Sequence, residues 1–196
     1  MNVAPNSPLL VVRMSNWIGD VVLMLPALQR LERHYRLHLV GKRWLGELLA
    51  AYGWACHVHP RSWRERVALL RRLRALDPAA RALCVPTSLS SALEFRLAGL
   101  PAVGYAKEGR SPLLARALPL PKGVHMADHF GRLADALLAP LQGPGATPDS
   151  PAESAARLRL GKDAEAKARE ALASANVSTR FVVVCPLASG AIDGQD

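Results

Sequence analysis

The stretch that decides the fold of this chain reads Leu9-Leu10-Val11-Val12-Arg13-Met14-Ser15-Asn16-Trp17-Ile18-Gly19-Asp20-Val21-Val22. Its first residues form a short apolar run that is rich in β-branched side chains, which predicts a buried strand. A small polar turn follows, and helix-type spacing then places apolar residues at Ile18, Val21, Val22, Leu25 and Leu28. A strand, a tight turn and a helix in this order form the opening unit of a parallel α/β domain.

The turn between this strand and helix is the place where a ligand is expected. In open parallel sheets, ligands bind beyond the carboxyl ends of the strands. Asp20 falls in the first helical turn, where the helix N-terminus favours a carboxylate anion. Because a carboxylate within hydrogen-bond reach can take a proton from an attacking hydroxyl, Asp20 is the candidate catalytic base. The alternative is that Asp20 only caps the helix.

The alternation of strands and helices continues through the first 140 residues. Further strands are predicted at 37–40, 55–59, 82–85 and 102–105. Helices are predicted over 18–35, 44–52 and 125–138, with one more that begins at residue 62 and another that ends at residue 98. Pro26 removes one backbone hydrogen bond from the first helix, so a kink or a restart is expected there. Residues 113–124 are expected to be loosely structured. The pattern predicts a Rossmann-like parallel sheet flanked by helices.

A segment rich in proline and glycine, 140–153, predicts a linker. The expected organisation is one domain over 1–140, a linker over 141–155 and the start of a second α/β domain over 156–196. That second part is expected to hold strands at 157–160 and 181–185 and a helix at 163–174. A buried strand followed by a short loop is an unusual end for a domain, so the second domain is expected to be incomplete.

Composition limits the classes of partner and compartment. The formal charge of +9 and the pI near 10.2 indicate an anionic partner, namely nucleic acid, an acidic membrane surface or a phosphorylated substrate. Cys56, Cys84 and Cys185 are far apart in apolar contexts, which is typical of reduced thiols in a cytosolic protein. No signal peptide is recognised, and the longest apolar run, 21–28, is far shorter than the roughly 20 residues that span a bilayer.

The sequence lacks the usual cofactor motifs. A Gly-x-Gly-x-x-Gly fingerprint and a phosphate loop ending in Gly-Lys-Ser/Thr are both absent, which argues against a dehydrogenase or a nucleotide hydrolase. The cysteines and histidines do not have the spacing of metal ligands. We therefore expect neither a cofactor nor a metal. The four tryptophans are expected to serve packing rather than sugar stacking.

Several polar residues are candidates for substrate contacts. In the opening turn, Ser15 and Asn16 offer short polar groups, and Gly19 would allow a tight turn and close approach of a ligand. The segment 61–74 carries six arginines and one acid, which indicates either a solvated helix face or a site for carboxylates and phosphates. The candidates for anion contacts are Arg61, Arg64, Lys107 and Arg110. Ser88, in the loop after residue 85, is a weaker candidate for a substrate contact.

Three stretches in order carry a resemblance to a known family. Residues Met14-Ser15-Asn16-Trp17-Ile18-Gly19-Asp20 with Leu25-Pro26-Ala27-Leu28 resemble the N-terminal signature of the ADP-heptose:lipopolysaccharide heptosyltransferases (glycosyltransferase family 9), most closely the heptosyltransferase II type. Two later stretches are similar to further landmarks of that family, one from Val85 to Tyr105 and one of His125-Met126-Ala127-Asp128-His129-Phe130. The resemblance spans about residues 9 to 190.

The resemblance implies a GT-B glycosyltransferase, in which two Rossmann-like domains face each other across a cleft. The N-terminal domain would bind a Kdo-lipid A type acceptor, and the C-terminal domain would bind the donor, ADP-L-glycero-D-manno-heptose. The implied reaction adds heptose to the lipopolysaccharide inner core, with inversion and without a metal, and Asp20 would be the base. The implied location is the cytoplasm, at the anionic inner face of the cytoplasmic membrane.

The resemblance also implies a donor-binding turn at 186–190, where Ser189 and Gly190 would contact the donor and Leu187 replaces the usual glycine. Because the rest of such a donor domain is missing, the chain is expected to be inactive by itself. Two alternatives stay open, which are a non-catalytic basic module that binds RNA or another polyanion and a related glycosyltransferase with a different donor. Nucleic acid is not expected, since the sequence has neither an RNA-binding signature nor an aromatic stacking pair.

Overall fold

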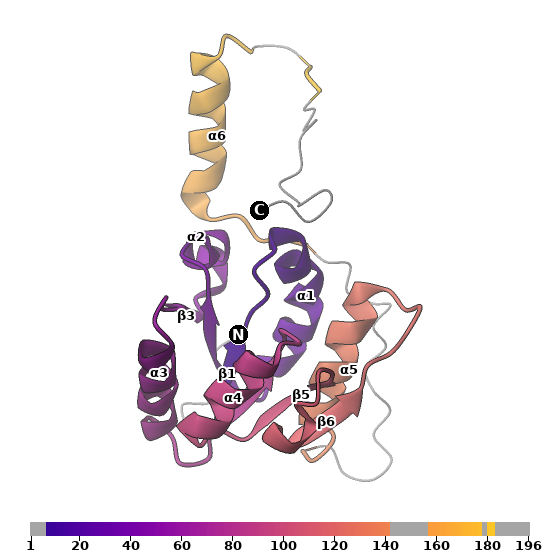
Figure 1. The fold of residues 1–196 in the computed structure, drawn as a ribbon. Helices are drawn as coiled ribbons and strands as arrows, with labels where there is room; N and C mark the ends of the chain where they lie inside the picture. Colours follow the sequence, from indigo (N-terminus) through magenta and orange to yellow (C-terminus); the bar gives the residue numbers. More distant parts are fainter. Residues whose placement is uncertain (1–6, 142–156, 178–179, 183–196) are drawn as a thin grey trace, which may run out of the picture. The chain divides into compact units, whose positions relative to one another are not determined.

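The core of the chain is a six-stranded parallel sheet. The computed structural model describes residues 7–141, 157–177 and 180–182, and Figure 1 shows the sheet with its helices. The strand order is β3-β2-β1-β4-β5-β6, and every pair of neighbouring strands is parallel. The strands are β1 (Leu9–Arg13), β2 (Arg36–Gly41), β3 (Ala55–Val58), β4 (Arg81–Cys84), β5 (Ala102–Ala106) and β6 (Arg116–Pro119).

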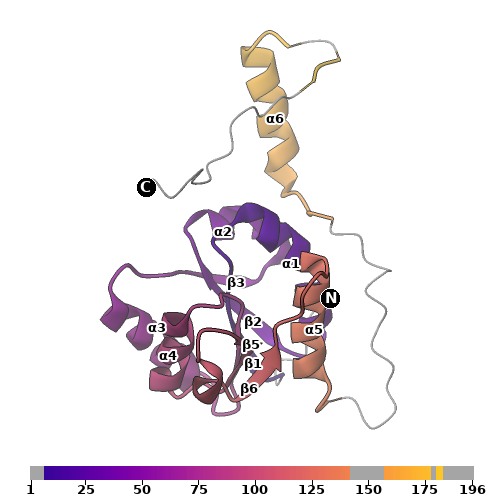
Figure 2. The same cartoon turned by 45° about the vertical axis from the view of Figure 1, so that its right-hand side comes forward.

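Helices cover both faces of the sheet, as Figure 2 shows. Alternate residues of β1 point to opposite layers, so Leu10 and Val12 pack toward α1 and α5 while Leu9 and Val11 pack toward α3 and α4. Burial on both faces explains why the central strands are almost wholly apolar. The helices of this part are α1 (Ile18–Leu31), α2 (Trp44–Leu48), α3 (Trp63–Ala75), α4 (Leu89–Ala98) and α5 (Met126–Leu138), with short 3-10 turns η1 (Ala50–Tyr52) and η2 (Ser111–Leu113).

The topology places a crevice at the carboxyl ends of β1 and β4. From β1 the chain adds β2 and β3 on one side and then crosses to add β4, β5 and β6 on the other side. The loops that leave β1 and β4 therefore diverge, and ligands of such sheets bind at this switch point. The last residues of the two strands, Arg13 and Cys84, lie side by side in register. The predicted Rossmann-like parallel sheet is confirmed.

Two local predictions for this part were wrong. The segment 116–119, expected to be loosely structured, is the edge strand β6, and it tolerates Pro119 because an edge strand pairs on one side only. The first helix runs through Pro26 without a restart, and it ends at Leu31 instead of residue 35. The chain leaves the helix there because Tyr35 enters the core, where the Tyr35 hydroxyl donates to the Leu137 carbonyl at 3.2 Å.

The chain divides into two compact units, 1–159 and 160–196. The second unit contains the predicted helix as α6 (Lys162–Ser174). Residues 157–160 are not a strand, which contradicts the prediction, and 181–182 are not in a strand either. Residues 183–185 and most of the predicted linker lie outside the described residues, so the predicted domain boundaries stay a prediction.

The described cysteines are free thiols. Cys84 is buried and Cys56 is half-buried, and burial raises the pKa of both thiols. Neither side chain is therefore a ready nucleophile at neutral pH. The prediction of reduced, packed cysteines is confirmed for these two, while Cys185 lies outside the described residues.

A histidine pair on β2 and β3 makes the stability of the fold sensitive to acid. His38 Nδ1 and His57 Nε2 are 3.0 Å apart, and burial lowers the pKa of both imidazoles. The unfolded chain binds protons at these two histidines more readily than the folded chain does. The free energy of unfolding is therefore at its full value above about pH 6.5 and falls as the pH drops toward the folded-state pKa values. We expect the melting temperature to decrease between pH 7.5 and 5.5 in a calorimetric scan.

Replacing His38 by Gln should flatten this pH dependence. Replacing His34, which is exposed, by Gln should leave it unchanged. An equal pH dependence in the wild type and in His38→Gln would contradict the assignment.

Candidate functional site

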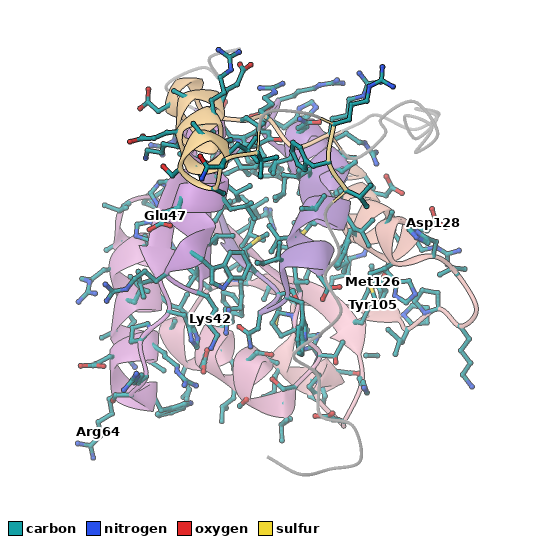
Figure 3. All side chains as sticks on the ribbon, turned by 90° about the horizontal axis from the view of Figure 1, so that it is seen from above. Lys42, Glu47, Arg64, Tyr105, Met126 and Asp128 are labelled. Atoms are coloured by element: carbon teal, nitrogen blue, oxygen red, sulfur yellow. The ribbon has the colours of Figure 1, made fainter. Side chains whose placement is uncertain are left out.

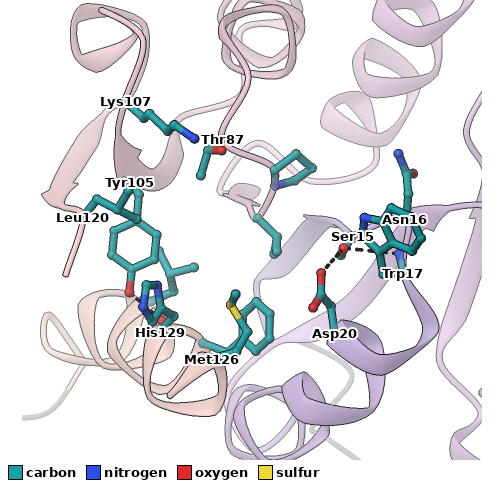
Figure 4. A pocket seen from close by; sticks show the side chains of 14 residues that line it. Ser15, Asn16, Trp17, Asp20, Thr87, Tyr105, Lys107, Leu120, Met126 and His129 are labelled. Carbon is teal, nitrogen blue, oxygen red and sulfur yellow. Dashed lines mark hydrogen bonds between the residues drawn. The ribbon is translucent and has the colours of Figure 1, made fainter. Parts of the chain in front are cut away.

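A cavity of about 430 Å³ lies at the carboxyl edge of the sheet, beside the switch point. Figure 4 shows it from close by, with Asp20 on one wall and Tyr105 and Lys107 on the opposite wall. The loops that follow β1, β4, β5 and β6 build the walls together with the start of α5. Its lining consists of Ser15, Asn16, Trp17, Asp20, Val85, Pro86, Thr87, Tyr105, Lys107, Leu120, Met126, His129, Phe130 and Leu133.

The carboxylate of Asp20 lines this cavity and does not cap its helix. Ser15 Oγ donates a hydrogen bond of 2.6 Å to Asp20 Oδ2, and the backbone N–H of Trp17 donates to Ser15 Oγ at 3.3 Å. Trp17 is the N-cap residue of α1, and no side chain caps this helix. Among the described residues, Asp20 accepts no hydrogen bond from the helix backbone. The capping alternative therefore lacks the contact that it requires.

The wall opposite Asp20 presents a neutral phenol and the ammonium group of Lys107. Tyr105 donates a hydrogen bond of 2.6 Å to the His129 carbonyl, and burial raises the pKa of its phenol to about 12. The Tyr105 hydroxyl thus stays protonated, and its proton is used in the hydrogen bond to the His129 carbonyl in α5. Lys107 is exposed and lines the cavity, and its role as an anion contact stays a prediction.

Exposed apolar side chains surround the mouth of the cavity. Trp17 is 59% exposed, and Met126 and Leu120 are 42% and 37% exposed. The prediction that Trp17 packs in the core was wrong, because it sits in the polar turn, outside the apolar stripe of α1, while packing at an interface stays a prediction. Thr87, Tyr105 and His129 also line the cavity, and none of them was predicted to do so. All three fall within the stretches that carry the family resemblance, so a signal for them was present in the sequence.

A second cavity, of about 320 Å³, adjoins the first and is basic. Asn16 and Pro86, which follow β1 and β4, line both cavities, so the two lie on either side of the switch point. The second cavity also includes Ser88 and Ser90. Its charged and titratable lining consists of Arg13, Lys42, His59, Arg61, Arg66 and Glu94.

The single carboxylate of this second cavity is already paired. Glu94 is buried, and Arg66 Nη1 and His59 Nε2 lie 3.2 and 3.5 Å from its oxygens. Burial alone would raise the pKa of Glu94, but the hydrogen bonds from His59 and Arg66 hold this pKa below its usual value. Arg66 also donates to the carbonyls of Pro60 and Arg61, at 2.8 and 2.9 Å. Its guanidinium thereby holds the loop that carries Arg61.

Arg13 forms the floor of the basic cavity. It is 8% exposed, and its Nη1 donates to the Met14 carbonyl at 2.9 Å. Burial lowers the pKa of this guanidinium, and Glu94 partly offsets the effect. Within the described part of the chain, Arg13 Nε has no hydrogen-bond partner. The cavity therefore has more cationic groups than anions to pair with them.

Two of the predicted anion contacts lie elsewhere. Arg64 is exposed near the start of α3 and lines neither cavity, and in Figure 3 it points away from the sheet while Tyr105 and Met126 lie together on the far side. Arg110 is fully buried, which excludes direct contact with a ligand in this structure. Its Nε donates to the Tyr105 carbonyl at 2.8 Å, and its Nη1 donates to the carbonyls of Pro86 and Ser88. Arg110 thus joins the loops that follow β4 and β5.

The remaining candidates have mixed outcomes. Ser88 is the N-cap of α4, where its Oγ accepts from the Ser91 N–H at 3.4 Å, and it lines the basic cavity. Gly19 lies inside the first turn of α1, and a Cβ at this position would meet nothing within 4 Å. Gly19 is thus helical and not part of a tight turn, which corrects that prediction, while its close approach to a ligand stays a prediction. Ser189 and Gly190 lie outside the described residues.

Within 7–141, 157–177 and 180–182, no three His, Cys, Asp or Glu side chains gather in a way that could hold a metal ion. No helix among these residues is long and apolar enough to cross a membrane.

The fold matches solved structures, although no family model and no curated protein sequence matches the chain. E. coli ADP-heptose lipopolysaccharide heptosyltransferase II is 21% identical over 87% of this chain and 51% of its own, with a TM-score of 0.62. E. coli heptosyltransferase WaaC with ADP-2-deoxy-2-fluoro heptose is 19% identical over 71% of this chain and 51% of its own, with a TM-score of 0.52. The same enzyme with ADP is 22% identical over 71% and 50%, with a TM-score of 0.51.

These similarities establish a shared fold. The chain spans about half the length of each of the three structures.

Proposed function

We propose that this chain is the acceptor-binding part of an inverting glycosyltransferase that moves heptose from ADP-L-glycero-D-manno-heptose to the lipopolysaccharide inner core. The observation that carries the proposal is the position of Asp20, whose carboxylate lines a cavity at the switch point and does not cap its helix. The fold shared with E. coli heptosyltransferases, one of which was solved with a fluorinated ADP-heptose, supports the choice of donor.

The chemistry needs one base on this chain. As the acceptor hydroxyl attacks the anomeric carbon, its O–H bond breaks and the proton passes to a carboxylate oxygen of Asp20. The new bond forms on the face opposite the departing ADP, which inverts the anomeric centre. The residues that would neutralise the leaving diphosphate belong to a donor-binding domain, for which Ser189 and Gly190 are the proposed contacts on this chain. The proposed reaction uses no metal and no cofactor.

The basic cavity is suited to the anionic groups of the acceptor. A Kdo-lipid A type acceptor carries carboxylates and phosphates, and Arg13, Lys42 and Arg61 line a cavity with a single, already paired carboxylate. Because Asn16 lines both cavities, one acceptor molecule can place an anionic group beside Arg61 while its hydroxyl reaches Asp20. Lys107 is the proposed anion contact on the other wall. An acceptor of this kind also implies that the enzyme acts in the cytoplasm, at the anionic surface of the inner membrane.

Binding of the acceptor by this chain tests the proposal without any donor. In titration calorimetry with a deacylated, Kdo-containing lipopolysaccharide fragment, we expect Arg61→Ala to weaken binding about tenfold through loss of charge-assisted hydrogen bonds. The matched variant Arg64→Ala should change the dissociation constant less than about twofold, because an exposed charge outside the cavity is screened.

A different outcome would favour a polyanion-binding module. If RNA bound as tightly as the Kdo-containing fragment, with a steep salt dependence and equal loss in both arginine variants, the acceptor assignment would be wrong.

A further inference from the structure

The proton of the Ser15 hydroxyl is committed within the protein, although the residue's type and place suggest a ligand contact. It is half-buried in the turn that leaves β1. A serine hydroxyl has one proton to donate, and Ser15 gives it to Asp20 Oδ2 at 2.6 Å while accepting the Trp17 N–H at 3.3 Å. No proton of this hydroxyl is left for a substrate.

The arrangement replaces an ordinary capping box. In a capping box, the acid at the third helical position reaches back to the backbone N–H of the N-cap residue. Here the N-cap is Trp17 and the third helical residue is Asp20, but the Trp17 N–H goes to Ser15 instead. Ser15 therefore accepts the N–H of the N-cap residue and leaves the Asp20 carboxylate available for another task.

Only one oxygen of Asp20 is occupied. Oδ2 accepts from Ser15, whereas Oδ1 has no hydrogen-bond partner among the described residues. Figure 4 shows the carboxylate directed into the cavity, tethered on one side by the Ser15 bond. An aspartate at an exposed helix start can otherwise occupy several staggered rotamers.

We infer that Ser15 is a positioning residue, which fixes the rotamer of Asp20 so that Oδ1 faces the acceptor hydroxyl. The inference rests on the proposed function for its catalytic consequence, and it replaces the predicted role of Ser15 as a substrate contact. A misplacement of about 1 Å at a reacting group can cost about 100-fold in rate. Holding one carboxylate oxygen with a short bond prevents that loss while the other oxygen receives the proton.

The first test needs no enzymatic activity. Three-bond scalar couplings measured by NMR on this chain report the χ1 angle of Asp20. The wild type and Ser15→Thr, which keeps the hydroxyl, should show a single rotamer, and Ser15→Ala should show averaged couplings. Averaged couplings in the wild type, or unchanged couplings in Ser15→Ala, would overturn the inference.

The second test measures heptose transfer by the complete gene product. Ser15→Ala should lower kcat about 10- to 100-fold and leave the KM of acceptor and donor within about threefold, with recovery in Ser15→Thr. Ser62→Ala, at the N-cap serine of α3, whose side chain makes no capping bond, should retain full kcat. An unchanged kcat in Ser15→Ala would overturn the positioning role.

Parallel assay of Asp20→Asn separates this failure from failure of the proposed function. An active Asp20→Asn enzyme would refute the base assignment itself. An inactive Asp20→Asn enzyme beside a fully active Ser15→Ala enzyme would refute only the role of Ser15.

Discussion

Replacement of Asp20 by Asn is expected to lower the kcat of heptose transfer about 10²- to 10⁴-fold, the usual contribution of a general base. Asparagine keeps the shape of the side chain, and its carbonyl oxygen can still accept the bond from Ser15. It cannot take a proton from the acceptor hydroxyl. Because the side chain acts on the reacting hydroxyl, the KM of both substrates should change by less than about threefold.

The control for this variant is Asp128→Asn. Asp128 lies in the first turn of α5, at the same edge of the sheet, but it does not line the cavity. Both variants remove a carboxylate that interacts favourably with a helix N-terminus, so each should lose up to about 1 kcal/mol of folding stability. Only Asp20→Asn should lose activity. Equal rates in the two variants would show that Asp20 has no chemical role.

The second large effect concerns folding. Replacement of Arg110 by Met is expected to lower the free energy of unfolding by about 3 to 5 kcal/mol, because the carbonyls of Tyr105, Pro86 and Ser88 each lose a hydrogen bond from a charged donor. Arg110 is fully buried, and its guanidinium supplies the carbonyls of Tyr105, Pro86 and Ser88 together with Ser91 Oγ. Methionine replaces the aliphatic part of the side chain but donates nothing.

Equilibrium denaturation in urea measures this loss. The variant Arg64→Met removes an equally large cation from an exposed site and should change stability by about 0.5 kcal/mol or less. Arg110→Lys should fall between the two, because a single ammonium cannot reproduce the planar set of donors. Unfolding of Arg110→Met at the same urea concentration as the wild type would contradict this role.

The sheet and its helices could be predicted because their signals are local and strong. The apolar run Leu9–Arg13 predicts a buried strand, and the spacing of apolar residues from Ile18 onward predicts an amphipathic helix, in both cases without any tertiary information. Strand β6 could not be predicted, because its four residues have no pattern of their own and form a strand only by pairing with β5. Likewise, the place where α1 ends depends on the burial of Tyr35 against α5.

The candidate site was predictable in part for the same reason. Lys107 follows β5 directly, Asn16 lies in the turn after β1 and Asp20 in the first turn of α1. The parallel topology brings these segments to one edge of the sheet. The state of each arginine was not predictable, because Arg110, Arg66 and Arg64 occur in similar polar stretches. Which of them is buried, which braces a loop and which is solvated depends on neighbours distant in sequence, such as Glu94 and the Pro86 carbonyl.

The most direct measurement is heptose transfer by the complete gene product, followed by mass spectrometry of a Kdo-containing lipopolysaccharide acceptor. With ADP-heptose as donor, the account predicts that the acceptor gains one heptosyl residue, with inverted configuration at the new linkage and release of ADP. With a nucleotide sugar that carries a different sugar, the acceptor should stay unchanged. Absence of transfer from ADP-heptose, together with transfer from the other donor, would contradict the account.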